Sequence, residues 1–273
     1  MYTSGNRRGQ QIKLIYMVKP FLIIISFLVC IVPIFSYGQQ NDFISYYPED
    51  SSVSNAAGQP KDSLAYYYPT EITTNHGVVK TNIDDFMENW FSSTLYCAQS
   101  PVLFNHYLGH DIYRFLWLRS FHVPVIFTLH KSGEKVWLTT KKLNKQPEFL
   151  NVTYKIAKFK KTKKTKMGKT RFRKPIKVVD SIVKADRKAE VIFTQTKQLS
   201  INEWNEFELL LKNCSFWNRL PFVDSSGIDG SEWTIEAHFK NKYWFVNRWS
   251  PDDNFKTAGE YLIRKSGINE EIY

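Results

Sequence analysis

Residues 111–140 constrain the fold more than any other part of the chain. In Asp111–Arg119, apolar residues occupy both sets of alternate positions, which is typical of a strand that is covered on both faces. Residues 122–130 are rich in β-branched side chains, and residues 135–140 follow a Lys-Ser-Gly-Glu turn. We therefore expect three neighbouring strands that form a meander, with the first of them in the interior of a sheet.

The remaining periodic segments extend this pattern. Ser200 and Glu203 have the spacing of a capping box, in which a hydroxyl and a carboxylate cap the first turn of a helix. Strands outnumber helices and follow one another as hairpins, which predicts an α+β fold. We expect a single domain with an antiparallel sheet of about six strands and three or more packed helices. Helices are predicted at residues 82–97, from residue 201 onward and at residues 255–265, and further strands at residues 187–195, 232–238 and 242–248.

Residues 1–38 have the three parts of a signal peptide. Basic residues precede an apolar run at 21–34, and Ser36 and Gly38 provide the small side chains of a cleavage site after Gly38. The run is shorter than the roughly 20 residues of a membrane span. We expect an exported protein in the periplasm, the cell envelope or the extracellular space. An uncleaved N-terminal anchor is the alternative, and Met17 is an alternative start.

Residues 39–80 differ in composition from the rest of the chain. They are rich in Ser, Asn, Gln and Pro, and contain two tyrosine-proline islands at 46–48 and 66–69. This composition indicates a flexible arm or tether, or an arm that drapes over the domain through its tyrosines. The α+β domain is expected at 81–273, with a basic insertion at about 151–180.

The positive charge of the chain is concentrated in residues 155–177. Without residues 1–38 the net charge is +7, but residues 155–177 contribute +12, so the remainder carries −5. Such a segment is typical of polyanion binding. In an exported protein, anionic lipid or polysaccharide is the expected partner rather than nucleic acid, and a solvated extension without a partner is the alternative. Salt-sensitive binding to anionic vesicles would separate the two. The candidate polyanion-binding residues are Lys158, Lys160, Lys161, Lys163, Lys164, Lys166, Lys169, Arg171, Arg173 and Lys174.

Two cysteines, Cys97 and Cys214, lie beyond the signal peptide. Export permits a disulfide between them, but the sequence does not show whether their Cα atoms approach closely enough. A disulfide and two separate buried thiols are both compatible with the sequence. No Cys-x-x-Cys pair occurs, which disfavours a thiol redox site and a zinc ribbon.

Two blocks carry a resemblance to known proteins. Residues 113–122 read Tyr-Arg-Phe-Leu-Trp-Leu-Arg-Ser-Phe-His, and residues 227–251 contain Gly-Ile-Asp-Gly-Ser-Glu-Trp followed by Arg-Trp-Ser-Pro. In these blocks the chain resembles one uncharacterised bacterial family whose members carry no assigned activity. The resemblance implies a shared fold and supplies no reaction. The basic segment departs from the family pattern, which has a short connector there.

The candidate ligand site consists of polar residues within apolar strands. Arginine inside such a strand needs a carboxylate partner, because an unpaired buried charge is very costly, and Glu236 is the natural partner of Arg114. One hypothesis is a buried ion-pair network that only fixes the sheet. The other is a site in which arginine binds a carboxylate or phosphate in a bidentate manner. The residues of this candidate site are Arg114, Arg119, His122, Glu236 and Arg248.

No motif for a catalytic centre, metal or cofactor is present. His106 and His110 have the spacing of a helical metal pair, but Gly109 lies between them and no Glu follows the first His. There is no Gly-x-Ser-x-Gly elbow and no glycine-rich phosphate loop. We expect no catalytic residues, no metal and no cofactor.

Three functional hypotheses follow, and none of them fixes the oligomeric state. The leading one is an exported, non-enzymatic binding or structural module of the cell envelope. The second is an enzyme of unknown reaction with a site around Arg114, His122, Glu236 and Arg248. The third is a polyanion binder that acts through residues 155–177.

Overall fold

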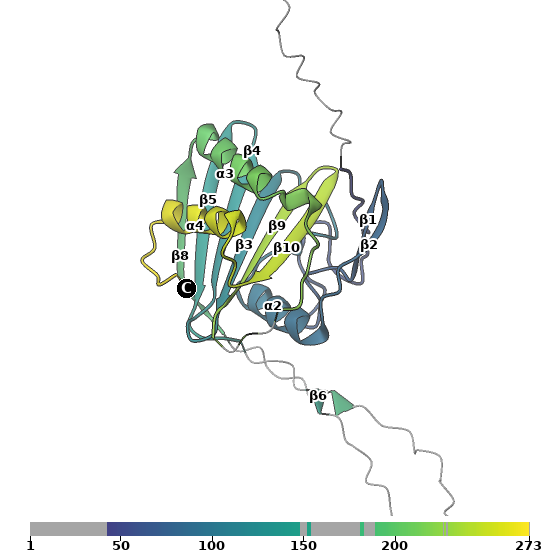
Figure 1. The fold of residues 1–273 in the computed structure, drawn as a ribbon. Helices are drawn as coiled ribbons and strands as arrows, with labels where there is room; N and C mark the ends of the chain where they lie inside the picture. The colour runs from purple at the N-terminus through teal and green to yellow at the C-terminus, as the bar shows by residue number, and fades with distance from the viewer. Residues whose placement is uncertain are drawn as a thin grey trace, which may run out of the picture. The chain divides into compact units, whose positions relative to one another are not determined.

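The computed structural model describes residues 43–147, 152–153, 181–182, 189–225, 227 and 229–272 (Figure 1). Residues 1–42, which contain the expected signal peptide, lie outside the described residues. The described residues belong to one compact unit. Its described residues form a single α+β domain around a six-stranded antiparallel sheet, so the predicted fold class is confirmed.

The strands of the main sheet are arranged in the order β10-β9-β3-β4-β5-β8. β3 lies inside the sheet between β9 and β4, as expected for a strand with apolar side chains on both faces. The predicted meander is β3, β4 and β5, and the predicted C-terminal hairpin is β9 and β10. The bounds are β3 (Asp111–Arg119), β4 (Val125–Ser132), β5 (Lys135–Leu143), β8 (Val191–Leu199), β9 (Ser231–Phe239) and β10 (Lys242–Trp249).

Three α-helices occur in the described part of the chain, and two short strand pairs accompany the main sheet. The capping box at Ser200 and Glu203 is present and begins α3 as predicted. Gly267, with φ of 77°, ends α4 in the left-handed conformation that glycine favours. The bounds are α2 (Asp85–Cys97), α3 (Ile201–Asn213), the 3-10 turn η1 (Phe216–Asn218), α4 (Asn254–Ser266), β1 (Glu71–Thr74) with β2 (Gly77–Lys80), and β6 (Val152–Thr153) with β7 (Ser181–Ile182).

Aspartates cap two of the helices. Asp84 accepts the hydrogen bond from the first turn of α2, and Asn82 before it adopts a left-handed φ of 57°. Asp253 caps α4, and the nearby Ser250 hydroxyl accepts a hydrogen bond from the backbone of Ser231.

β8 lies about four residues later than the strand predicted at residues 187–195 and is largely exposed. The predicted strand has Ala189, Val191 and Phe193 at alternate positions, between polar residues. Among the described strands, β8 pairs with β5 alone, at the edge of the sheet. Most of its side chains are exposed, including Phe193 at 38%. The alternation of apolar and polar residues in this segment therefore does not indicate a half-buried strand.

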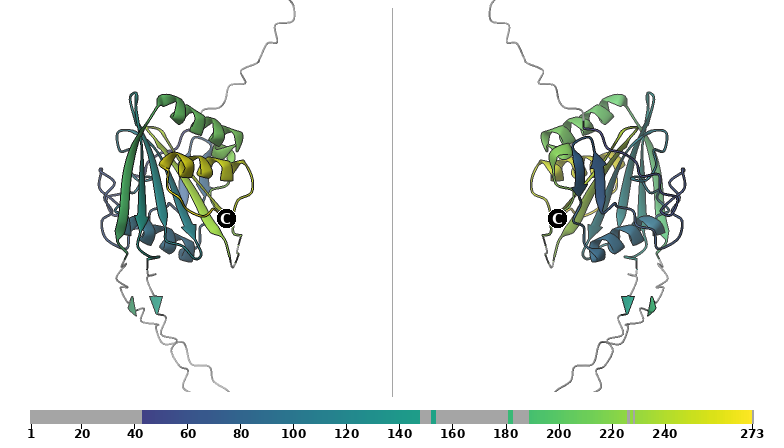
Figure 2. Two further views of the ribbon diagram at one scale, coloured as in Figure 1. Left: turned by 90° about the vertical axis from the view of Figure 1, so that its left-hand side faces the viewer. Right: turned by 90° about the vertical axis from the view of Figure 1, so that its right-hand side faces the viewer.

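The two faces of the sheet are covered by different parts of the chain. Figure 2 shows α3 and α4 together on one side of the sheet. On that face Tyr113 of β3 packs against Trp204 and Phe207 of α3. α4 approaches closely because Gly259 has no side chain. A Cβ there would lie 2.4 Å from the Trp233 ring.

The opposite face is covered by the segment that precedes β3. Tyr67 and Tyr68, from the predicted arm or tether, are buried. The Tyr68 ring contacts Phe91 of α2 and Phe245 of β10. Near the start of the segment, Ser45 accepts a hydrogen bond from the backbone of Tyr243. Residues 43–80 therefore pack across this face of the sheet and cover its polar side chains.

Cys97 and Cys214 are both buried, and they form no disulfide with each other. The Cys214 thiol donates a 3.2 Å hydrogen bond to the carbonyl of Leu211, and burial raises its pKa. Of the two alternatives that the sequence leaves open, the structure contains two separate thiols.

Candidate functional site

Arg114 and Glu236 form a buried ion pair between β3 and β9. They are direct cross-strand neighbours, and both side chains are fully buried. The Nε atom of Arg114 lies 2.5 Å from Oε2 of Glu236, and an Nη atom donates to the carbonyl of Pro101 at 2.6 Å. Tyr243 donates its hydroxyl to the other carboxylate oxygen at 3.1 Å. The partner expected from the sequence is therefore the partner found, and the pair ties the sheet to the segment before β3.

A second buried carboxyl, Glu88 of α2, lies close to this pair. Its Oε1 accepts hydrogen bonds from the Ser92 hydroxyl and the backbone of Tyr68, whereas Oε2 has no partner among the described residues. Burial raises the pKa of Glu88 to about 8, and the charge of Glu236 adds to this increase. Glu88 is therefore largely protonated at neutral pH.

Arg119 points to the opposite face of the sheet from Arg114. It pairs with Glu270 at 2.8 Å, and its guanidinium lies 4.1 Å from the centre of the Trp117 ring. Lys142 also pairs with Glu270. These contacts attach the C-terminal segment to the end of β3.

His122 and Arg248 occupy two further places. His122 follows the end of β3 and lies 3.9 Å from the exposed Glu271. Arg248 of β10 donates hydrogen bonds to the carbonyls of Leu220 and Asn247. Of the predicted ligand site, the structure brings together Arg114 and Glu236 and leaves Arg119, His122 and Arg248 apart from them. Binding by these residues stays a prediction.

The basic segment 155–177 lies outside the described residues, so polyanion binding also stays a prediction. His106 and His110 do not lie on a helix, and His110 instead approaches His130 at 3.1 Å. Within the described ranges, no three His, Cys, Asp or Glu side chains are grouped closely enough to hold a metal ion.

A cavity of about 340 Å³ lies beside Glu232 of β9, and we call it the Glu232 cavity. Glu232, Met87 and Phe222 are its buried lining residues. The N-cap of α2, the segment before β9 and the end of β10 provide its other sides. The described lining residues are Asp84, Phe86, Met87, Trp90, Ser120, Phe222, Val223, Asp224, Ser225, Gly227, Glu232 and Trp249.

Glu232 is a buried carboxyl that no described cation neutralises. Its side chain accepts a 2.8 Å hydrogen bond from the Asn247 amide, and only 5% of the residue is exposed. Burial, together with the negative charges of Asp84 and Asp224, raises its pKa to about 7. The Glu232 carboxyl therefore changes its charge near neutral pH while facing a cavity.

Trp249 is held in the wall of the Glu232 cavity by two glycines. A Cβ on Gly227 would lie 2.2 Å from the indole Nε1, and one on Gly230 would lie 2.7 Å from the same ring. These glycines belong to the Gly-Ile-Asp-Gly block that the sequence singles out. The absence of a side chain at these glycines allows the backbone to lie close to the Trp249 ring, in addition to any role that they have in a turn.

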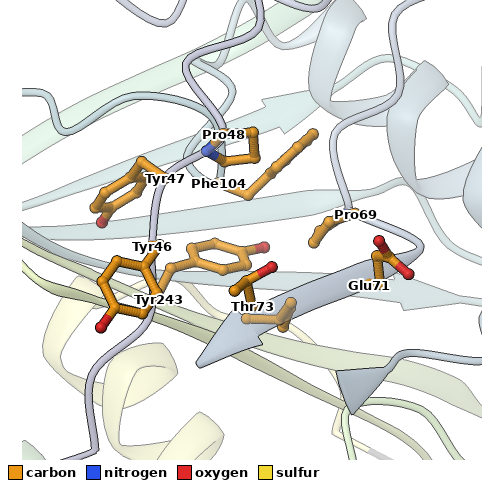
Figure 3. Close-up of a pocket in the computed structure, with 9 residues that line it drawn as sticks. Tyr46, Tyr47, Pro48, Pro69, Glu71, Thr73, Phe104 and Tyr243 are labelled. Atoms are coloured by element: carbon orange, nitrogen blue, oxygen red, sulfur yellow. The ribbon is translucent and has the colours of Figure 1, made fainter. Parts of the chain in front are cut away.

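A second cavity of about 340 Å³ lies on the face covered by residues 43–80, and we call it the tyrosine cavity. Figure 3 shows the segment with Tyr46, Tyr47 and Pro48 on one side and β1 on the other. Phe104 and Tyr243 lie between them. The Tyr47 hydroxyl already donates to the carbonyl of Phe239 at 2.7 Å. Glu71 is the carboxylate of this cavity, and it is exposed.

Glu232, Trp90 and Trp249 are not among the site residues predicted from the sequence. A signal was available for Glu232, because it shares one face of β9 with Thr234, Glu236 and His238. That face is polar although the strand is buried on both sides. No local signal links Trp90 to this strand, since Trp90 and Glu232 line the same cavity only as a result of tertiary packing.

The comparisons with known proteins provide no function for this arrangement. No family model, curated protein or solved structure matches the chain. The resemblance to an uncharacterised family therefore stays a prediction. Within the described residues, no helix combines the length and apolar character that crossing a membrane requires.

Proposed function

We propose that this chain is an exported, non-enzymatic binding module of the cell envelope, with the Glu232 cavity as its ligand site. The observation that carries the proposal is a buried carboxyl that faces a cavity instead of a protein cation. A buried ionisable group is costly unless it is paired, so its presence beside a cavity favours a role in binding.

The separation of the other polar residues supports binding rather than catalysis. Arg114 and Arg119 lie on opposite faces of β3, and each is engaged by a carboxylate and a backbone carbonyl. The arrangement therefore lacks the convergence that the enzyme hypothesis requires of these residues. Export is supported by the signal-peptide pattern of residues 1–38. N-terminal sequencing of the mature protein should begin at Gln39, and intact protein recovered from the cytoplasm would contradict export.

A thermal-shift screen of small molecules at pH 8 tests the ligand site. A ligand at one hundred times its Kd should raise Tm by roughly 5–10 °C. We expect the shifts to disappear in Glu232→Gln, which keeps the size and the contact with Asn247 but removes the charge. Glu71→Gln, in the tyrosine cavity, is the matched control and should keep them. Shifts lost only in Glu71→Gln would place the ligand in the other cavity and refute the proposal.

A further inference from the structure

We propose that the ligand of the Glu232 cavity is a small organic cation, a protonated or quaternary amine held by the Glu232 carboxylate and by the rings of Trp90 and Trp249. This inference rests on the proposed function and adds the chemical class of the ligand.

The charge of the Glu232 cavity is the first argument. Its described lining includes three carboxyls, those of Asp84, Asp224 and Glu232, and among these lining residues there is no Lys, Arg or His. Asp84 and Asp224 are exposed, so salt screens them, whereas Glu232 is buried and is screened much less. An anionic ligand would be repelled by all three groups, and a cation would be attracted.

The aromatic side chains are the second argument. Phe86, Trp90, Phe222 and Trp249 line the same cavity as the carboxyls. Aromatic rings attract cations through their π faces, most strongly in tryptophan, and such contacts gain strength when water is excluded. A neutral apolar ligand would fill the space but would leave the Glu232 carboxylate buried without a counter-charge. The combination of rings and a carboxylate therefore favours a cation.

The type of cation follows from the same lining. Ca²⁺ and Mg²⁺ require several oxygen ligands in a defined geometry, and aromatic rings supply none. An alkylammonium ion instead presents apolar groups to the rings and its charge to the carboxylate. A cavity of about 340 Å³ is large enough for an alkylammonium ion and much larger than a bare metal ion requires.

The protonation of Glu232 gives the inference a pH dependence. The charged groups acting on Glu232 are Asp84, before α2, and Asp224, before β9, and its hydrogen-bond donor is Asn247 of β10. With a pKa near 7, Glu232 is mostly ionised at pH 8 and mostly neutral at pH 5. If only the ionised form binds the cation, affinity should fall by up to about a hundredfold over this range.

Isothermal titration calorimetry of the mature protein at pH 8 tests the inference. Choline and benzylamine serve as cationic probes, with 3,3-dimethyl-1-butanol and benzyl alcohol as neutral molecules of similar shape. We expect at least one cation to bind about tenfold or more tightly than its neutral counterpart. Glu232→Gln should remove this preference, and Glu71→Gln should keep it.

The possible outcomes separate this inference from the proposed function. Equal affinity for the cations and their neutral counterparts, or no heat from either cation, overturns the inference. If ligands of another class then depend on Glu232, the proposed function survives. The comparison of probes uses the wild-type protein, so it decides the question even if Glu232→Gln does not fold. Near-UV circular dichroism and Tm establish whether that variant is folded.

Discussion

Replacement of Arg114 by methionine should lower the free energy of unfolding by about 3–5 kcal/mol. The substitution removes the cation but leaves the Glu236 carboxyl buried, where Tyr243 still donates its hydroxyl. It also leaves the carbonyl of Pro101 without the donor that Arg114 provides. Urea denaturation at pH 7, followed by tryptophan fluorescence, measures the change.

The double variant Arg114→Met/Glu236→Leu is the matched control. Both charges are then absent, and apolar side chains of similar size fill the space, so much of the lost stability should return. If the free energy of unfolding of Arg114→Met lies within about 1 kcal/mol of the wild-type value, the Arg114–Glu236 pair does not stabilise this face of the sheet.

Arg114→Lys separates the structural and ligand-binding hypotheses for the pair. Lysine keeps the charge but loses the planar fork of donors that engages both Glu236 and Pro101. A loss of stability fits the structural account. If Arg114→Lys folds but no longer binds ligand, Arg114 belongs to a ligand-binding site.

Glu88→Gln should raise the free energy of unfolding by roughly 3–5 kcal/mol at pH 8 and change it little near pH 4.5. Burial raises the pKa of Glu88 from 4.5 to about 8 in the folded state. The folded protein therefore binds more protons than the unfolded chain between these values. This contribution to stability is fully present below pH 4.5 and is lost as the pH rises through 8. Glutamine mimics the protonated carboxyl and has no charge to bury.

Urea denaturation of wild type and Glu88→Gln across pH 4.5–8.5 measures this difference. His130 and His238 also titrate, because burial lowers their pKa to about 4, and they destabilise the fold as the pH falls below 6.5. They are common to both proteins and cancel in the comparison. Parallel stability curves for the two proteins would contradict the assignment of a protonated Glu88.

The parts of the fold that the sequence predicts are those with a local signal. The apolar residues on both faces of residues 111–119 place β3 in the interior, and the same reasoning identifies Glu236 as the partner of Arg114. The capping box at Ser200 marks the start of α3. Each of these inferences depends only on a local residue pattern or on the free-energy cost of burying an unpaired charge.

The features that the sequence does not predict depend on contacts between distant segments. Arg119 finds its partner, Glu270, in the C-terminal segment, 151 residues later. The Glu232 cavity combines α2, residues 222–225 and 227, and the last residue of β10, and no spacing rule connects these parts. The buried position of Tyr67 is also not evident from the polar composition around it. Tertiary packing decides all three.

A crystal structure of the mature protein grown with the tightest-binding organic cation tests the central claim most directly. The account predicts that the bound cation lies in the Glu232 cavity, with its charged nitrogen in contact with the Glu232 carboxylate and with Trp90 or Trp249. A cation bound in the tyrosine cavity, or a Glu232 cavity that is filled only by water while binding persists in solution, would contradict it.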